Sequence, residues 1–150
     1  MQLVLDPSQY LIDKRFDDGT RERAASDLDM LGHQYAIPAL VAVLRDETDV
    51  PQVRQRCIRA LRMIRDKRAV VHLIDDALGS EHRQLVRDAM WDLTEFAGRP
   101  PKLADPSFVG GIKPPPEDPE QRSEYFKTWH DWWDKVKDDA ELTRMNVGDN

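Results

Sequence analysis

The stretch VRQRCIRALRMIRDKRAVVHLIDDAL, residues 53–78, decides the fold. Its first part places Cys57, Leu61 and Ile64 at spacings of four and three residues, which is the apolar stripe of an amphipathic helix. After a short polar break, a second apolar stripe with helical spacing runs through residues 69–78. Two amphipathic helices joined by a short connection predict an antiparallel helical hairpin.

The same pattern occurs on both sides of this hairpin. Three first helices carry an arginine, a small or branched apolar residue and two larger apolar residues: Arg21, Ala24, Leu28, Leu31; Arg54, Cys57, Leu61, Ile64; and Arg83, Val86, Met90, Leu93. These sets lie 33 and 29 residues apart. Two second helices match at the same distance of 33 residues: Ile37, Leu40, Val41 and Val70, Leu73, Ile74. Self-similarity near this period predicts stacked hairpins, each of which buries its apolar face on the next.

Polar caps and glycines indicate where the helices begin and end. We expect five helices in the repeats, over residues 21–31, 36–44, 50–64, 69–78 and 81–97. Thr20, Asp49 and Ser80 are the expected N-caps of the first, third and fifth of them, because their side-chain oxygens can accept hydrogen bonds from free backbone N–H groups.

The hairpin pattern resembles HEAT repeats of the short bacterial kind that is related to phycobilisome-lyase repeats. The arginine, small residue and leucine of the first helix and the acidic residues near the end of the second carry this resemblance, which covers about residues 20–98. It implies an all-α fold, a short right-handed α-solenoid. It also implies a protein-binding scaffold, although a minority of such proteins are bilin lyases or DNA glycosylases.

Composition divides the chain into three parts. Residues 1–98 hold the repeats with an N-terminal extension, and residues 99–122 form a proline-rich arm with seven of the ten prolines, so we expect this arm to be extended. Residues 123–150 hold an amphipathic aromatic helix, expected over about 123–140, and a tail.

The aromatic helix contains Trp129, Trp132 and Trp133 on one stripe with Tyr125 and Val136. The third hairpin has a first helix and no second helix after it, so an end of the array needs a cover. The favoured interpretation is that the aromatic helix caps this end of the same chain, against Trp91 and Phe96. The alternatives are a hot-spot helix for another protein and a haem or bilin pocket.

The second helices carry the other candidate binding residues. The face that includes Ala39 and Val43 is apolar, opposite the core face of the same helix. Either residues 1–18 pack over it, which is favoured, or it receives a partner segment. The matching face of the next repeat is polar, with His72, Asp75 and Asp76.

The net charge is -6 and no part of the chain is basic, which disfavours nucleic acid as the partner. The arginines of residues 54–65 spread around their helix, so we expect ion pairs and a solvated face in place of a phosphate track. No apolar run could insert in a membrane and no export signal is recognisable, so a cytoplasmic location is expected.

No nucleophile, base or metal set converges in the sequence, and His130 with Asp134 lacks a third metal ligand. We therefore predict a non-catalytic interaction module or small accessory subunit of a larger assembly, with no cofactor and no metal. A bilin or tetrapyrrole lyase-type or other ligand-handling enzyme is the alternative. The predicted partner is another protein, and the predicted partner-binding residues are Ala39, Val43, His72, Asp75, Asp76, Phe108, Trp129, Trp132 and Trp133.

Overall fold

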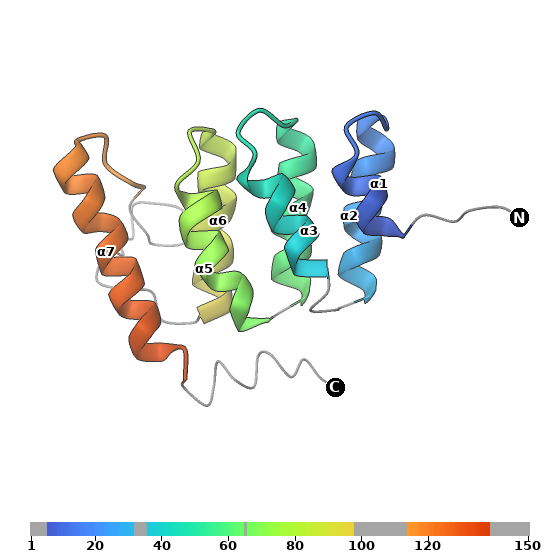
Figure 1. The fold of residues 1–150 in the computed structure, drawn as a ribbon. Coiled ribbons are helices and arrows are strands. Elements are labelled where there is room, and N and C mark those ends of the chain that lie inside the picture. The colour runs from blue at the N-terminus through green and yellow to red at the C-terminus, as the bar shows by residue number, and fades with distance from the viewer. Residues whose placement is uncertain (1–5, 32–35, 65, 98–113, 139–150) are drawn as a thin grey trace, which may run out of the picture. The chain divides into compact units, whose positions relative to one another are not determined.

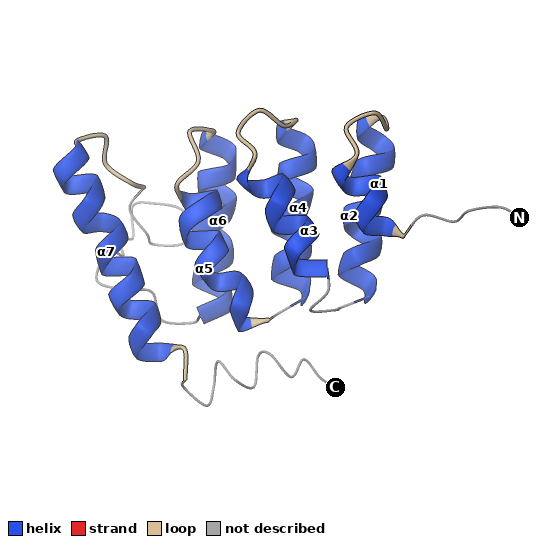
Figure 2. Cartoon of the chain, viewed as in Figure 1, coloured by secondary structure: helices blue, strands red, loops and turns tan. Residues whose placement is uncertain are grey.

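A computed structural model describes four ranges of the 150-residue chain: 6–31, 36–64, 66–97 and 114–138 (Figure 1). All regular secondary structure in these ranges is helical (Figure 2), which confirms the predicted all-α fold. The chain divides into two compact units, residues 1–64 and 65–150.

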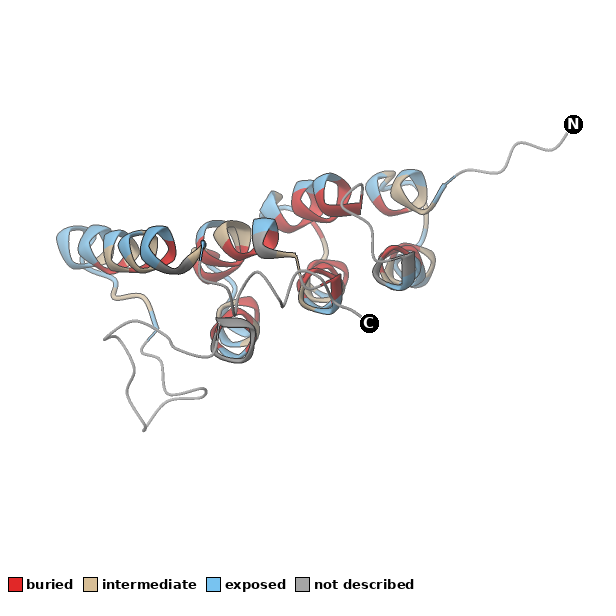
Figure 3. Cartoon of the chain, turned by 90° about the horizontal axis from the view of Figure 1, so that it is seen from below, coloured by how far each residue is buried: buried red, intermediate tan, exposed pale blue. Residues whose placement is uncertain are grey.

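The first unit contains four helices: α1 (Pro7–Ile12), α2 (Asp18–Leu31), α3 (Ala36–Arg45) and α4 (Pro51–Ile64). They form two layers, with α1 beside α3 in one and α2 beside α4 in the other (Figure 3). Each layer also packs on the other, α1 against α2 and α3 against α4. Cys57 and Leu61 are fully buried in α4, as the predicted repeat register requires.

The short helix α1 lies in the N-terminal extension, where no helix was predicted. The Asp6 carboxylate accepts hydrogen bonds from the N–H groups of Ser8 and Gln9, and the Gln9 side chain accepts from the Asp6 N–H. This reciprocal capping box, with Pro7 at the first helical position, begins the helix. Since α1 packs against α3, the N-terminal extension covers part of that helix, as the favoured interpretation held.

The expected N-cap of α2 was wrong. The helix begins at Asp18, and the carboxylate of Asp17 accepts a hydrogen bond from the Thr20 N–H at 2.7 Å. Asp17 is therefore the residue whose side chain satisfies a free donor of the first turn, and Thr20 lies inside the helix.

The arginine of the repeat pattern has a structural role at two of its three positions. Arg21 and Arg54 are both almost fully buried. The Arg21 Nε donates to the Leu11 carbonyl at 2.8 Å, and the Arg54 Nη2 donates to the Leu44 carbonyl at 2.8 Å. Leu11 and Leu44 lie in the last turns of α1 and α3, where carbonyl groups have no partner within the helix. Arg21 thus caps the C-terminal end of α1, and Arg54 caps that of α3. Arg54 is therefore buried and does not belong to the solvated face that the sequence predicted.

Asp49, the expected N-cap of α4, instead pairs with Arg21. The two guanidinium–carboxylate distances are 2.7 and 2.6 Å, and both side chains are buried. Burial favours the neutral acid, but the hydrogen bonds from Arg21 and from the Val50 N–H outweigh it and hold the pKa of Asp49 below its ordinary value. The first unit therefore contains a buried, bidentate ion pair that links α2 to the start of α4.

The second unit contains a 3-10 turn η1 (Lys67–Ala69), one α-helical turn α5 (Val70–His72), a π-helix η2 (Leu73–Leu78), α6 (Arg83–Ala97) and α7 (Pro119–Val136). The helix expected over 69–78 is thus real but is α-helical only in part. Helix α6 packs against η2. The Ser80 hydroxyl accepts from the His82 N–H at 3.0 Å, so Ser80 does help to begin α6, two residues later than expected.

The repeat register predicted for α6 was wrong. The buried residues of α6 match those of α4 at a distance of 32 residues, not 29: Leu85, Ala89, Met90 and Leu93 correspond to Val53, Cys57, Ile58 and Leu61. Val86 then takes the position of the buried Arg54, and Arg83 is exposed. Arg83 was matched to Arg21 and Arg54 because all three are arginines near the start of a first helix. The third hairpin, however, lacks the buried arginine cap of the first two.

Gly79 follows η2 at a point where the backbone leaves no room for a side chain. Its φ of -83° is open to any residue, but a Cβ placed there would overlap the Asp75 carbonyl oxygen. We expect Gly79→Ala to lower the free energy of unfolding by about 1–3 kcal/mol, because the backbone must shift to relieve this overlap.

Gly19 provides the matched control for Gly79. It lies in the first turn of α2, and a Cβ there would approach no atom closer than 3.4 Å. Gly19→Ala should raise stability by about 0.4–1 kcal/mol through the entropy of the unfolded chain. Thermal unfolding followed by circular dichroism measures both changes. Equal effects of the two substitutions would contradict the close approach at Gly79.

Candidate functional site

Helix α7 begins four residues earlier than expected because Asp118 and Pro119 start it. The Asp118 carboxylate accepts from the Gln121 N–H at 3.0 Å, and Pro119 occupies the first helical position. The helix lies beside η2, in the same layer (Figure 3). It therefore supplies a neighbour to the last second helix of the repeats.

The aromatic stripe of α7 packs inside the second unit. Trp129 and Trp133 are buried, which confirms the prediction for these two rings, whereas Trp132 is only half-buried. The Trp129 and Trp132 ring centroids are 5.4 Å apart in an edge-to-face arrangement. The expected cover over Trp91 does not form: α7 packs on η2, and Trp91 is 48 % exposed. The side chain of Phe96, the other expected contact, lies outside the described part of the chain.

Tyr125 extends this aromatic cluster by one turn. Its ring lies edge-on to that of Trp129, with centroids 6.5 Å apart. Burial raises the pKa of Tyr125 to about 12, and the nearby Trp129 indole and Arg122 guanidinium offset only part of that shift. The phenol is therefore held neutral at physiological pH.

A polar edge runs along the same two helices. His130 of α7 lies 2.6 Å from the Asp75 carboxylate of η2, which ties the two elements together at the surface. His72 lies 3.1 Å from Asp76 one turn away. Three of the predicted binding residues, His72, Asp75 and Asp76, are thus brought to one edge, together with His130.

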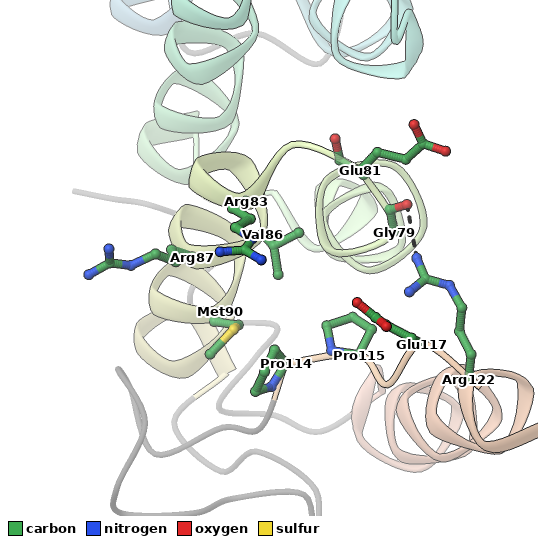
Figure 4. Close-up of a pocket in the computed structure, with 11 residues that line it drawn as sticks. Gly79, Glu81, Arg83, Val86, Arg87, Met90, Pro114, Pro115, Glu117 and Arg122 are labelled. Carbon is green, nitrogen blue, oxygen red and sulfur yellow. Dashed lines mark hydrogen bonds between the residues drawn. The ribbon is translucent and has the colours of Figure 1, made fainter. Parts of the chain in front are cut away.

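A cleft of about 860 Å³ opens where η2 ends, between α6 and the residues that precede α7 (Figure 4). Its apolar lining comes from Val86 and Met90 of α6 and from Pro114 and Pro115. Its charged lining comes from Arg83, Arg87, Arg122, Glu81 and Glu117. The volume lies within the range of sites that bind small ligands or short chain segments.

Arg122 is held in place on one side of this cleft. Its guanidinium donates to the Gly79 carbonyl at 3.3 Å and to the Pro116 carbonyl at 3.4 Å. The same group lies 5.4 Å from the centre of the Phe126 ring, within the range of a cation–π contact. Arg122 thus donates to the carbonyl that follows η2. In this hairpin Val86 occupies the position that corresponds to the buried Arg54, so Arg122 takes over the role of the arginine cap.

Two predicted site residues of the first unit are not at the surface. Ala39 and Val43 are buried, and α1 packs against their helix α3. Both side chains are therefore covered within the first unit. Phe108 lies outside the described residues, as does most of the predicted proline-rich arm.

Cys57, the single cysteine, is buried in α4. Burial, and after it the Asp49 carboxylate, raise the pKa of the thiol well above its ordinary value. We expect no reaction with a disulfide reagent at pH 8 in the folded protein and complete reaction in concentrated urea. A thiol that is labelled as fast in the native protein as in urea would contradict the described packing.

The layers of paired helices, with their repeated arginine caps, can be compared with known families. A family model for HEAT repeats matches residues 8–93, more than half of the chain. The chain belongs to the HEAT-repeat family. This result confirms the resemblance and the predicted α-solenoid class, and the match ends before α7 begins.

The other two comparisons add no relative, because neither the curated proteins nor the solved structures gave a match. Among the described helices, none combines the length and the apolar character that crossing a membrane needs. HEAT repeats are commonly protein-interaction scaffolds, which supports the general class predicted for this HEAT protein.

The sequence did not reveal the cleft or the position of Arg122. One signal was present: Arg122 follows the cap Asp118 by one helical turn, so it had to project near the start of α7. Its contact with Gly79 joins residues that are far apart in the sequence, and no periodicity encodes such a contact.

Proposed function

We propose that this HEAT-repeat protein is a non-catalytic interaction module, a small accessory subunit that binds another protein through the edge formed by η2 and α7. The observation that carries the proposal is the side-by-side packing of α7 on η2, joined by His130 and Asp75. This packing places α7 beside η2, the last second helix of the repeats. The polar side chains of the edge therefore project from helices, which hold them more firmly than a loop would.

The chemistry of this edge favours a protein partner. Asp75 is exposed, whereas the side chains of His72 and Asp76 are 27 % and 13 % exposed and pair with each other, so an incoming chain would meet Asp75 first. Trp132 lies on α7 two residues after His130 and is half-buried, and tryptophan is enriched among the residues that dominate binding energy. Carboxylates on η2 and a partly covered ring on the neighbouring α7 suit a partner with basic and apolar side chains. A cytoplasmic location remains part of this proposal.

A site-specific photo-crosslink tests the proposal in the cells that make the protein. Trp132 is replaced by benzoylphenylalanine, an aromatic residue of similar size, in the full chain. We expect one defined protein adduct after illumination. The control places the same residue at Arg23, which is exposed on α2 in the first unit, and we expect no adduct of that mass there.

The carboxylates give a second test. Asp76→Asn should reduce the yield of the adduct at position 132 by about tenfold if the acidic edge contributes to binding. The same adducts at positions 23 and 132 would contradict the proposal. A tetrapyrrole found by visible absorbance and mass spectrometry of the purified native protein would instead favour the lyase-type alternative.

A further inference from the structure

The exposed surface of α6 carries a strip of three side chains that the proposed edge does not use. Arg83, Arg87 and Trp91 follow one another at intervals of four residues, so they lie along one side of the helix. All three are exposed. We call these three residues the α6 strip.

The charges of the α6 strip are uncompensated within the part of the chain that the structure describes. No hydrogen bond or ion pair joins the side chain of Arg83 or Arg87 to another residue of the described ranges. The nearby carboxylate of Asp88 instead accepts a hydrogen bond from Gln84 at 3.1 Å. By contrast, Arg21 is neutralised by Asp49 in a buried pair.

The cleft adjoins the strip, since Arg83 and Arg87 belong to both. Figure 4 shows Arg83 beside Val86 on the α6 wall, while Arg87 extends outward. On the opposite wall Arg122 donates to two backbone carbonyls, and Glu117 lies near it, so that wall carries charges of both signs. Glu81, two residues before Arg83, also lines the cleft, so the α6 side carries two arginines and one carboxylate, and the excess positive charge lies on this side.

We propose that the α6 strip, with the cleft beside it, binds an acidic segment of another protein. Carboxylates of the segment would pair with Arg83 and Arg87, since guanidinium groups bind carboxylates through two parallel hydrogen bonds. An apolar side chain of the segment would cover Trp91. Arginine and tryptophan are both enriched at the centres of protein interfaces. The proposal goes beyond the function above, because it names a second surface and the charge of its partner.

A binding measurement with defined peptides tests this proposal on the full chain. The probe is a fluorescein-labelled twelve-residue peptide that contains six glutamates and two leucines, and its matched control has glutamine at every glutamate position. We expect the anisotropy of the acidic peptide to rise with added protein, with an affinity at least about tenfold above that of the glutamine peptide. The difference should shrink as salt is added.

Variants locate the binding. The double substitution Arg83→Gln and Arg87→Gln should weaken binding at least about tenfold, and Trp91→Ala should weaken it with the charges intact. Arg59→Gln is the matched control, because Arg59 is an exposed helical arginine in the first unit, and it should leave the affinity unchanged. These substitutions replace exposed side chains, and circular dichroism verifies that each variant is folded.

Three results would overturn the proposal: no binding of the acidic peptide, equal binding of the glutamine peptide, or equal loss with Arg59→Gln. Each of them leaves the crosslink at position 132 untouched, so failure of this inference and failure of the proposed function are distinguishable. Binding of the acidic peptide without an adduct at position 132 would retain the α6 strip and reject the η2–α7 edge.

Discussion

Asp49→Ala is expected to lower the free energy of unfolding by about 3–5 kcal/mol, because it leaves the buried Arg21 guanidinium without its carboxylate partner. Within the described ranges, the Arg21 guanidinium would keep only its hydrogen bond to the Leu11 carbonyl. Urea unfolding followed by far-ultraviolet circular dichroism measures the loss. Circular dichroism is needed because all four tryptophans lie outside the first unit.

Asp46→Ala is the matched control for this prediction. Asp46 pairs with Lys14 at 2.6 Å, but both side chains are partly exposed to solvent. Ion pairs of this kind contribute about 0–1 kcal/mol. A loss at Asp49 no larger than the loss at Asp46 would mean that the Arg21–Asp49 pair does not hold α2 to the start of α4.

The same ion pair predicts a dependence of stability on pH. Because the pKa of Asp49 is lower in the folded state than in the unfolded chain, its contribution is present above the ordinary carboxyl pKa of about 3.9. It is lost as the pH falls through the folded value. The wild-type protein should therefore lose more stability than Asp49→Ala between pH 5 and pH 3, and parallel curves for the two would contradict this.

The helices other than α1 were predictable from the sequence because their signals are local. Apolar residues three and four positions apart located α2, α3, α4 and α6, and the second-helix stripe located α5 with η2. Fully buried Cys57 and Leu61 show that this period was assigned correctly in the second hairpin.

The errors came from residues whose role depends on distant partners. The sequence does not show whether a given arginine or aspartate is solvated or buried in an ion pair. It therefore could not distinguish exposed Arg83 from buried Arg54. Asp49 was read as a helix cap, although its main partner is Arg21, 28 residues earlier. Such contacts depend on how helices pack, and neither spacing nor propensity encodes them.

The candidate sites likewise depend partly on local spacing and partly on contacts between distant residues. The polar edge was partly predicted, since His72, Asp75 and Asp76 share one side of a helix. The addition of His130 required the position of α7 on η2. The α6 strip was missed because the wrong register matched Arg83 to the repeat positions of Arg21 and Arg54.

Trp129→Ala is expected to lower the free energy of unfolding of the second unit by about 3–5 kcal/mol, as removal of a fully buried large aromatic side chain does. Trp129 contacts the rings of Tyr125 and Trp132, so its loss leaves a cavity within the aromatic cluster. Thermal and urea unfolding measured by the fluorescence of the remaining tryptophans would show the change, and Trp132→Ala, at a half-buried ring, should cost clearly less.

The same substitution also tests whether Trp129 holds α7 on η2. If α7 is held on η2 mainly by Trp129, its alanine variant should also expose Trp133 to acrylamide quenching and weaken the His130–Asp75 contact at the surface. The crosslink at position 132 would then lose its defined product, although Asp75 and Asp76 are unchanged. If Trp129→Ala and Trp132→Ala instead cost the same small amount, the aromatic stripe does not anchor α7, and α7 must be treated as a separate docking helix.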